Sequence, residues 1–100
     1  MHLFHTLRWR QDRIAHIEQK HGVTQEEVEE AVFNDPYAIL LRGPRSESRH
    51  DSYIYYLLGR TTGGRYLTVV LLDLGGGAAL PVTARDMSQK ERRQYKRRRK

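Results

Sequence analysis

The spacing of the apolar residues changes at Pro36, and this change constrains the fold more than any other feature of the sequence. Before Pro36 the spacing is helical, because Ile14, Ile17 and His21 share one helix face. After Pro36 the apolar residues alternate with a period of two, in segments separated by glycine-rich turns. The order predicts an α+β domain whose helices pack on one face of a sheet.

Two helices are predicted before Pro36. The first begins near Arg10 and ends at Gly22, a residue suited to the left-handed position after a helix. The second begins at Thr24, which forms a capping box with Glu27. It ends before Pro36, because the residue preceding a proline avoids the helical conformation.

The rest of the chain predicts a roughly four-stranded antiparallel sheet followed by one more helix. Pro81 lies inside the last strand, which implies an edge position or a β-bulge there. A second capping box, Ser88 with Glu91, opens the C-terminal helix. The predicted strands cover residues 37–42, 52–60, 65–73 and 79–84, with a possible edge strand at 6–9.

Length and charge limit the class of protein. The 100 residues are room for a single domain, 1–100, and the absence of cysteine excludes disulfides and thiolate metal sites. No stretch is long and apolar enough to span a membrane, so a cytoplasmic protein is expected. The net charge of +6 comes from the C-terminal end, which finishes in a basic tail at 96–100. Such a block favours a polyanionic partner, although a solubilising tail remains the alternative.

Metal and cofactor chemistry find no support in the sequence. The five histidines show no metal-ligand spacing. The glycines at 75–77 lack the pattern of a phosphate-binding loop and precede a strand, so they indicate a hairpin turn. We therefore expect neither a metal nor a cofactor.

Arginine and tyrosine are the residues that could carry chemistry. A rigid guanidinium can bind a phosphate through two hydrogen bonds and stabilise charge that builds up during phosphodiester cleavage. Tyrosines could stack on bases, and Tyr95 could transfer a proton. The alternative is that most arginines are solvated and most tyrosines lie in the core, and convergence of several arginines on one spot would argue against it. The candidate arginines are Arg49, Arg60, Arg65, Arg85, Arg92 and Arg93.

Several blocks of sequence occur in the order of a known family. They are Lys20-His-Gly-Val-Thr-Gln-Glu-Glu27, Val32-Phe-Asn-Asp-Pro36, Gly64-Arg-Tyr-Leu-Thr-Val-Val70, Val82-Thr-Ala-Arg-Asp-Met87 and Glu91-Arg-Arg-Gln-Tyr95. With these blocks the chain resembles the BrnT family of toxins, a ribonuclease branch of the RelE-like fold found in bacterial type II toxin–antitoxin modules. The resemblance implies metal-independent cleavage of RNA and a cognate DNA-binding antitoxin as partner.

The resemblance also implies which residues form the site. Arg85 is the first candidate for stabilising the transition-state phosphate, with Arg65 in support and Tyr95 as a further catalytic candidate. The expected RNA-binding residues are Lys20, Arg49, Arg60, Thr83, Arg92 and Arg93. His21, matched beside Lys20, either belongs to the site or only closes its helix.

The chain departs from the family pattern at one important place. The acidic-then-arginine segment expected before the strand that ends at Gly59 is missing, and the nearest substitute is Arg49-His50-Asp51. His50, whose reference pKa is about 6.5, is the hypothetical acid–base group. The departure keeps a second hypothesis open, a non-catalytic RelE-like domain that binds RNA or protein. A sequence-specific DNA-binding protein is disfavoured, because no helix-turn-helix pattern is present and the second helix is acidic.

Overall fold

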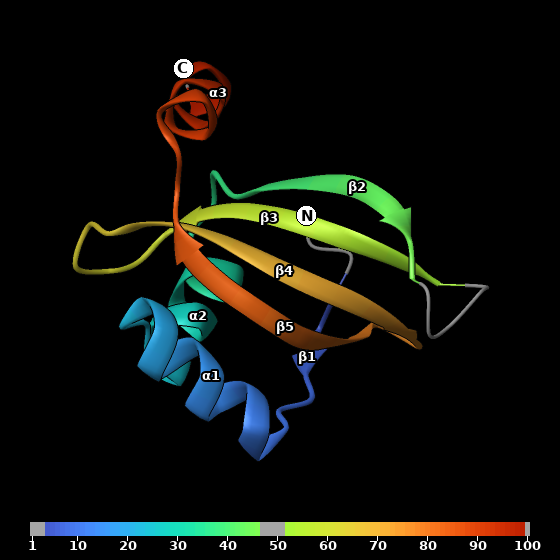
Figure 1. Cartoon of the computed structure of the whole chain (residues 1–100). Coiled ribbons are helices and arrows are strands. Elements are labelled where there is room, and N and C mark those ends of the chain that lie inside the picture. Colours follow the sequence, from blue (N-terminus) through green and yellow to red (C-terminus); the bar gives the residue numbers. More distant parts are fainter. Residues whose placement is uncertain (1–3, 47–51, 100) are drawn as a thin grey trace.

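The computed structural model describes residues 4–46 and 52–99 and shows an α+β fold built on a five-stranded mixed sheet (Figure 1). The strand order is β1-β5-β4-β3-β2. The elements are β1 (Thr6–Leu7), α1 (Gln11–His21), α2 (Gln25–Glu29), the π-helical turn η1 (Glu30–Asn34), β2 (Ile39–Arg45), β3 (Tyr53–Arg60), β4 (Tyr66–Gly75), β5 (Ala78–Asp86) and α3 (Gln89–Arg99).

The antiparallel meander from β2 to β5 is confirmed, but the prediction of a purely antiparallel four-stranded sheet is wrong in detail. β1 adds a fifth strand, which runs parallel to β5 and pairs Thr6 with Ala78. The backbone N–H of His5 fixes this strand by donating to the carbonyl oxygen of Gly77 over 2.7 Å. A strand of two residues carries no alternation, so the sequence could not show how it pairs.

The helices cover both faces of the sheet, which corrects the expectation that they share one. α1 and α2 pack on one face around Ile17, Val28 and Leu57, whereas α3 packs on the opposite face, where Tyr95 meets Leu58 (Figure 1). The physical reason lies in β3, because the neighbouring residues Leu57 and Leu58 point to opposite faces and both are buried. A strand that is apolar on both sides requires cover on both sides.

The predicted helix ends are confirmed. Gly22 ends α1 with a left-handed φ of 64°, and the Thr24 hydroxyl and Glu27 carboxylate exchange the hydrogen bonds of a capping box at α2. The helix then widens into η1 before it stops at Asp35. Pro81 lies at a β-bulge, since consecutive residues of β4 pair with Thr83 and then with Pro81. None of the described helices is long and apolar enough to cross a membrane.

Candidate functional site

Arg85 lies near the end of β5 and binds the first turn of α3. Its Nη1 and Nη2 donate to the two carboxylate oxygens of Glu91 over 2.8 and 3.0 Å. The hydroxyl of Thr68 and the backbone N–H of Ser88 donate to the same carboxylate over 2.9 and 2.8 Å. These four donors, with Arg85 contributing most, lower the pKa of Glu91 to about 2. Glu91 therefore remains charged and holds the guanidinium in one orientation.

Local sequence explains why this pair forms. Arg85 and Thr68 are cross-strand partners, so their side chains point to the same face of the sheet. The backbone N–H of Met87 donates to the carbonyl oxygen of Tyr66 over 3.1 Å and fixes the turn that follows β5. The Ser88–Glu91 capping box then starts α3 directly above Thr68 and Arg85, as the sequence predicts.

The surface beside Arg85 is part of the sheet face that α3 covers. The next cross-strand row places Thr83 beside Val70, which in turn pairs with Tyr56. The hydrogen bond to Glu91 raises the pKa of Arg85, and the nearby Tyr56 phenol adds to the effect. The Arg85 side chain is 39% exposed, whereas the hydroxyl oxygen of Thr83 is buried and has no hydrogen-bond partner among the described residues. A polar ligand that reaches this row would meet both groups.

Arg65 lies on the other face and is fully engaged in holding the fold together. Its Nε donates to Asp86 over 2.8 Å, and its Nη1 donates to the carbonyl oxygen of Gly22 over 2.8 Å and to Glu27 over 3.3 Å. Its Nη2 reaches Asp86 and the carbonyl oxygen of His21 over 3.2 Å each. Arg65 therefore joins the end of α1, the start of α2 and the end of β5.

The two arginines expected to converge bind helices on opposite faces of the sheet. Arg65 binds the helices of one face, and Arg85 binds the helix of the other. The hydrogen bond between Arg65 and Asp86 raises the pKa of the guanidinium and lowers that of the carboxyl, as in a structural ion pair. Both arginines also contact Asp86, Arg65 through its carboxylate and Arg85 through its backbone carbonyl oxygen over 3.2 Å.

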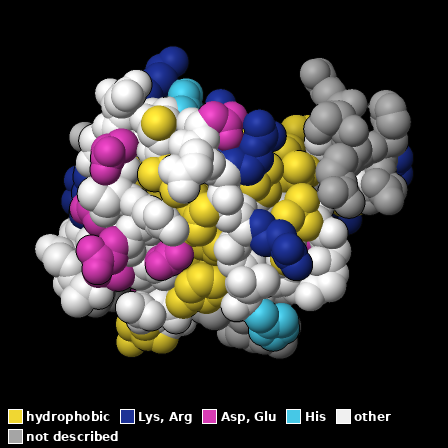
Figure 2. All heavy atoms as spheres, turned by 90° about the horizontal axis from the view of Figure 1, so that it is seen from below, with side chains coloured by type: hydrophobic (Ala, Val, Ile, Leu, Met, Phe, Trp, Pro, Cys, Tyr) yellow, Lys and Arg dark blue, Asp and Glu magenta, His cyan; other side chains and the backbone are white. Residues whose placement is uncertain are grey.

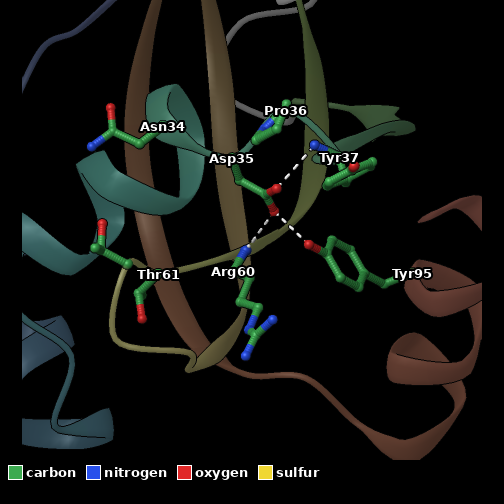
Figure 3. A pocket seen from close by; sticks show the side chains of 8 residues that line it. Asn34, Asp35, Pro36, Tyr37, Arg60, Thr61 and Tyr95 are labelled. Atoms are coloured by element: carbon green, nitrogen blue, oxygen red, sulfur yellow. Dashed lines mark hydrogen bonds between the residues drawn. The ribbon is translucent and has the colours of Figure 1, made fainter.

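Tyr95 is buried and donates its hydroxyl proton to Asp35. The distance between the hydroxyl oxygen and Asp35 Oδ2 is 2.7 Å, and only 1% of Tyr95 is exposed. Asp35 also accepts the backbone N–H groups of Arg60 and Tyr37 over 2.8 and 2.9 Å (Figure 3). This carboxylate joins α3 to the β3 end and to the turn that precedes β2. The arrangement places Tyr95 in the framework rather than at the surface.

The remaining expected residues are dispersed. Arg60 and Arg92 meet at the ring of Tyr66, with guanidinium carbons 5.2 and 4.4 Å from the ring centroid. Arg93 is exposed on α3, and Lys20 is exposed in the last turn of α1 on the other side of the sheet. Arg49 and His50 lie outside the described residues.

Charge differs between the two faces. On the face covered by α1 and α2, acidic side chains gather on one side (Figure 2), where Glu26, Glu29 and Glu30 line a hollow with Phe33. On the α3 side, Glu91 is the helix's acid and is already bound to Arg85. The exposed basic residues of α3 are Lys90, Arg92, Arg93, Lys96 and Arg97. A polyanion therefore fits the α3 side better.

Residues 4–46 and 52–99 contain no group of three or more histidine, aspartate or glutamate side chains arranged to hold a metal ion. One side of the α+β sheet instead carries an ordered guanidinium, a basic helix and neighbouring tyrosines. They define a basic protein suited to binding a phosphate backbone.

Comparison with known proteins gives the family. Residues 9–91 match the model of the family described as "Ribonuclease toxin, BrnT, of type II toxin-antitoxin system", and the chain belongs to this family. A search of curated proteins found no match. Membership implies an RNA substrate and an antitoxin partner.

Sequence reasoning did not single out two residues that shape the α3 side, Glu91 and Tyr66. Glu91 was visible only as a capping residue, although the same carboxylate also receives Arg85 and Thr68. Tyr66 was one of several tyrosines without a distinct signal. The signal that could have found Glu91 is its position as the only acid from residue 90 to residue 100, next to a motif that contains Arg85.

Proposed function

We propose that the protein is a metal-independent endoribonuclease of a type II toxin–antitoxin module and that Arg85 binds the scissile phosphate. The observation that carries the proposal is the fixed, partly exposed guanidinium of Arg85, held by Glu91 on the basic side of the sheet. A guanidinium whose orientation is fixed beforehand needs little rearrangement when charge develops on a phosphate.

The proposed reaction uses the RNA's own nucleophile. The 2′-hydroxyl attacks the adjacent phosphorus and gives its proton to a general base, while the bond to the 5′-oxygen of the next nucleotide breaks. That oxygen takes up a proton, which leaves a 2′,3′-cyclic phosphate and a 5′-hydroxyl. Arg85 stabilises the charge on the non-bridging oxygens. We assign the proton transfer to His50, on the strength of its near-neutral reference pKa of about 6.5.

Other candidate residues receive different roles in this proposal. Thr83 and Arg93 are RNA contacts on the same side as Arg85. Arg65 and Tyr95 support activity through the fold, because every polar atom described for them is used in holding elements together. Lys20 lies on the side that bears the acidic hollow, so its RNA contact would be to a part of the strand away from Arg85.

The test is cleavage of a labelled single-stranded RNA by purified protein in the presence of EDTA. The proposal expects products that end in 2′,3′-cyclic phosphate, at the same rate with and without the chelator. Failure to cleave any of a set of RNAs of varied sequence, or cleavage only after a divalent metal is added, would overturn it.

A non-catalytic RNA-binding domain is the second candidate. Two observations favour it: the acid–arginine segment is missing from the sequence, and both terminal nitrogens of Arg85 already bind Glu91. Under this alternative, RNA binds but stays intact in the EDTA assay. Expression in bacteria separates the two further, because a toxin arrests growth and a neighbouring antitoxin gene relieves the arrest.

The proposal also includes a partner and a compartment. A cognate DNA-binding antitoxin would bind the protein in the cytoplasm and block its access to RNA. The open edge of β2 offers backbone groups for pairing with an added strand of the partner. Copurification of the protein with the product of the adjacent gene tests this part.

A further inference from the structure

Three cationic side chains surround the ring of Tyr66. Arg92 and Lys96 come from successive turns of α3 and lie 4.4 and 5.5 Å from the ring centroid. Arg60 comes from the end of β3, where it pairs with Tyr66, and lies 5.2 Å away. Cations are attracted to the face of an aromatic ring, so Tyr66 orders all three. The ring itself is fixed by an edge-on contact with the buried Tyr95 at 5.7 Å.

The cluster has no balancing negative charge among the described residues. Arg60, Arg92 and Lys96 take part in none of the ion pairs of this part of the chain, and the buried Nε of Arg60 has no hydrogen-bond partner there. The carboxylate of Asp35, which accepts the backbone N–H of Arg60, also accepts the Tyr95 hydroxyl and the backbone N–H of Tyr37. Three neighbouring cations repel each other, so binding of an anion would be favourable.

The surroundings have room for such an anion. Arg92 and Lys96 line a hollow of about 200 Å³ on α3 together with Gln89 and Arg93. Arg60 lines a separate pocket of about 260 Å³, whose other walls include Asn34, Asp35, Thr61 and Thr62 (Figure 3). Hydroxyl and amide groups are suitable neighbours for phosphate and ribose oxygens.

We infer that Arg60, Arg92 and Lys96 form a second phosphate subsite, which binds the RNA backbone away from the bond that is cut. The inference rests on the proposed function for the identity of the anion as RNA. Tyr66 and Thr68 are two residues apart on β4, and Thr68 pairs with Arg85. At about 3.3 Å per strand residue, the subsite lies roughly 7 Å along the strand from the row of Arg85. One RNA strand can therefore reach both places.

The chemistry favours a phosphate over a base or an acidic peptide. The ring of Tyr66 is already covered by the cations, so it is not free for stacking. Two guanidinium groups and an ammonium from different elements match the several oxygens of a phosphodiester. Contacts of this kind position a nucleic acid without reading its sequence.

The test compares two double variants of the full chain. Arg92→Gln/Lys96→Gln removes two charges at Tyr66, whereas the matched control Lys90→Gln/Arg97→Gln removes two exposed charges elsewhere on α3. The probe is a fluorescent single-stranded RNA that is fully 2′-O-methylated, which cannot be cleaved because its 2′-oxygen is blocked. Binding is followed by anisotropy over a range of salt concentrations, and circular dichroism checks the fold of each variant.

The inference expects Arg92→Gln/Lys96→Gln to weaken binding about tenfold or more. The slope of the logarithm of the binding constant against the logarithm of the salt concentration should become shallower by about 0.7 for each lost phosphate contact. The control variant should change the Kd by no more than about threefold. Equal effects of the two variants would overturn the subsite, since they would show only general attraction by a basic helix. Unchanged RNA binding with lost binding of an acidic partner protein would overturn it as well.

A third variant, Tyr66→Leu, keeps an apolar side chain but removes the ring that orders the cations, and it should weaken binding in the same direction. Parallel cleavage of unmodified RNA in EDTA separates this inference from the proposed function. Cleavage by the wild-type protein together with normal binding by Arg92→Gln/Lys96→Gln would reject the subsite alone. Binding that depends on Arg92 and Lys96 without any cleavage would reject the endoribonuclease alone and leave the subsite in place.

Discussion

Arg85 on β5 and Glu91 on α3 are joined by two hydrogen bonds, 2.8 and 3.0 Å long. The pair links the end of the sheet to the first turn of the C-terminal helix, and it uses the only acidic residue of that helix. The helix is therefore anchored, and its other charged side chains are all basic. The same contact thus serves stability and sets the orientation of the residue proposed to bind the scissile phosphate.

Replacing Glu91 with glutamine should make the free energy of unfolding less dependent on pH in the acidic range. The folded-state pKa of Glu91 is lowered from 4.5 to about 2, mainly by Arg85, so its charge stabilises the fold above about pH 4.5. That contribution disappears as the pH falls from about 4.5 to 2. At pH 7 we expect Glu91→Gln to lower the free energy of unfolding by about 1–3 kcal/mol.

Urea unfolding of the two proteins at pH 7, 4 and 2.5 measures the effect. The difference between wild type and Glu91→Gln should narrow as the pH approaches 2. A difference that stays constant over this range would show that the charge of Glu91 contributes nothing.

Replacing Arg65 should damage the fold rather than the chemistry. Arg65→Lys keeps the charge but loses the fork that reaches Asp86, Gly22 and Glu27, so we expect a loss of about 2 kcal/mol. Under conditions where the variant is folded, RNA cleavage should stay within about threefold of wild type. Arg10→Ala is the control, because its ion pair with Asp12 is exposed to solvent and should contribute little to stability.

Thermal unfolding and single-turnover cleavage are measured on the same preparations. Full stability of Arg65→Lys combined with a large loss of cleavage would restore Arg65 as a catalytic residue.

Local signals in the sequence were enough for much of the fold. Four predicted features depend only on residues close together in the chain, and the structure contains all of them. They are the two capping boxes, the left-handed Gly22 and the bulge at Pro81. Contacts between elements that are distant along the chain could not be predicted from such local signals. The parallel pairing of β1 and the placement of α3 opposite α1 depend on which apolar face is left uncovered after the sheet has formed.

The candidate site shows the same limit. Family resemblance singled out both Arg65 and Arg85. The partners that give the two arginines different roles lie far from them along the chain or belong to another helix or strand. Arg65 is 43 residues from Gly22, whose carbonyl oxygen it binds. No pattern along the chain states that Asp86 belongs to one arginine and Glu91 to the other.

Removing the hydroxyl of Tyr95 should reduce stability with little effect on cleavage. In Tyr95→Phe, Asp35 loses a buried donor at 2.7 Å, and we expect a loss of about 1–2 kcal/mol. Thermal unfolding and cleavage rates of the folded variant check this. A loss of cleavage of 100-fold or more, with the fold intact, would instead identify Tyr95 as a proton-transfer group.

Replacing His50 tests the assignment of proton transfer. His50→Ala should lower the cleavage rate about 100-fold and remove an inflection of the pH–rate profile near the ordinary histidine pKa of about 6.5. His16→Ala is the control, since His16 is a half-buried histidine on α1, outside the proposed site. An unchanged rate and profile in His50→Ala would exclude this residue.

Cleavage of RNA by Arg85→Ala tests the central claim most directly. The rate is measured in single turnovers with EDTA present, on protein whose circular dichroism spectrum and RNA affinity have been compared with those of wild type. We predict that cleavage falls about 100-fold or more while the protein stays folded and still binds 2′-O-methylated RNA. Cleavage by folded Arg85→Ala at the wild-type rate would contradict the account.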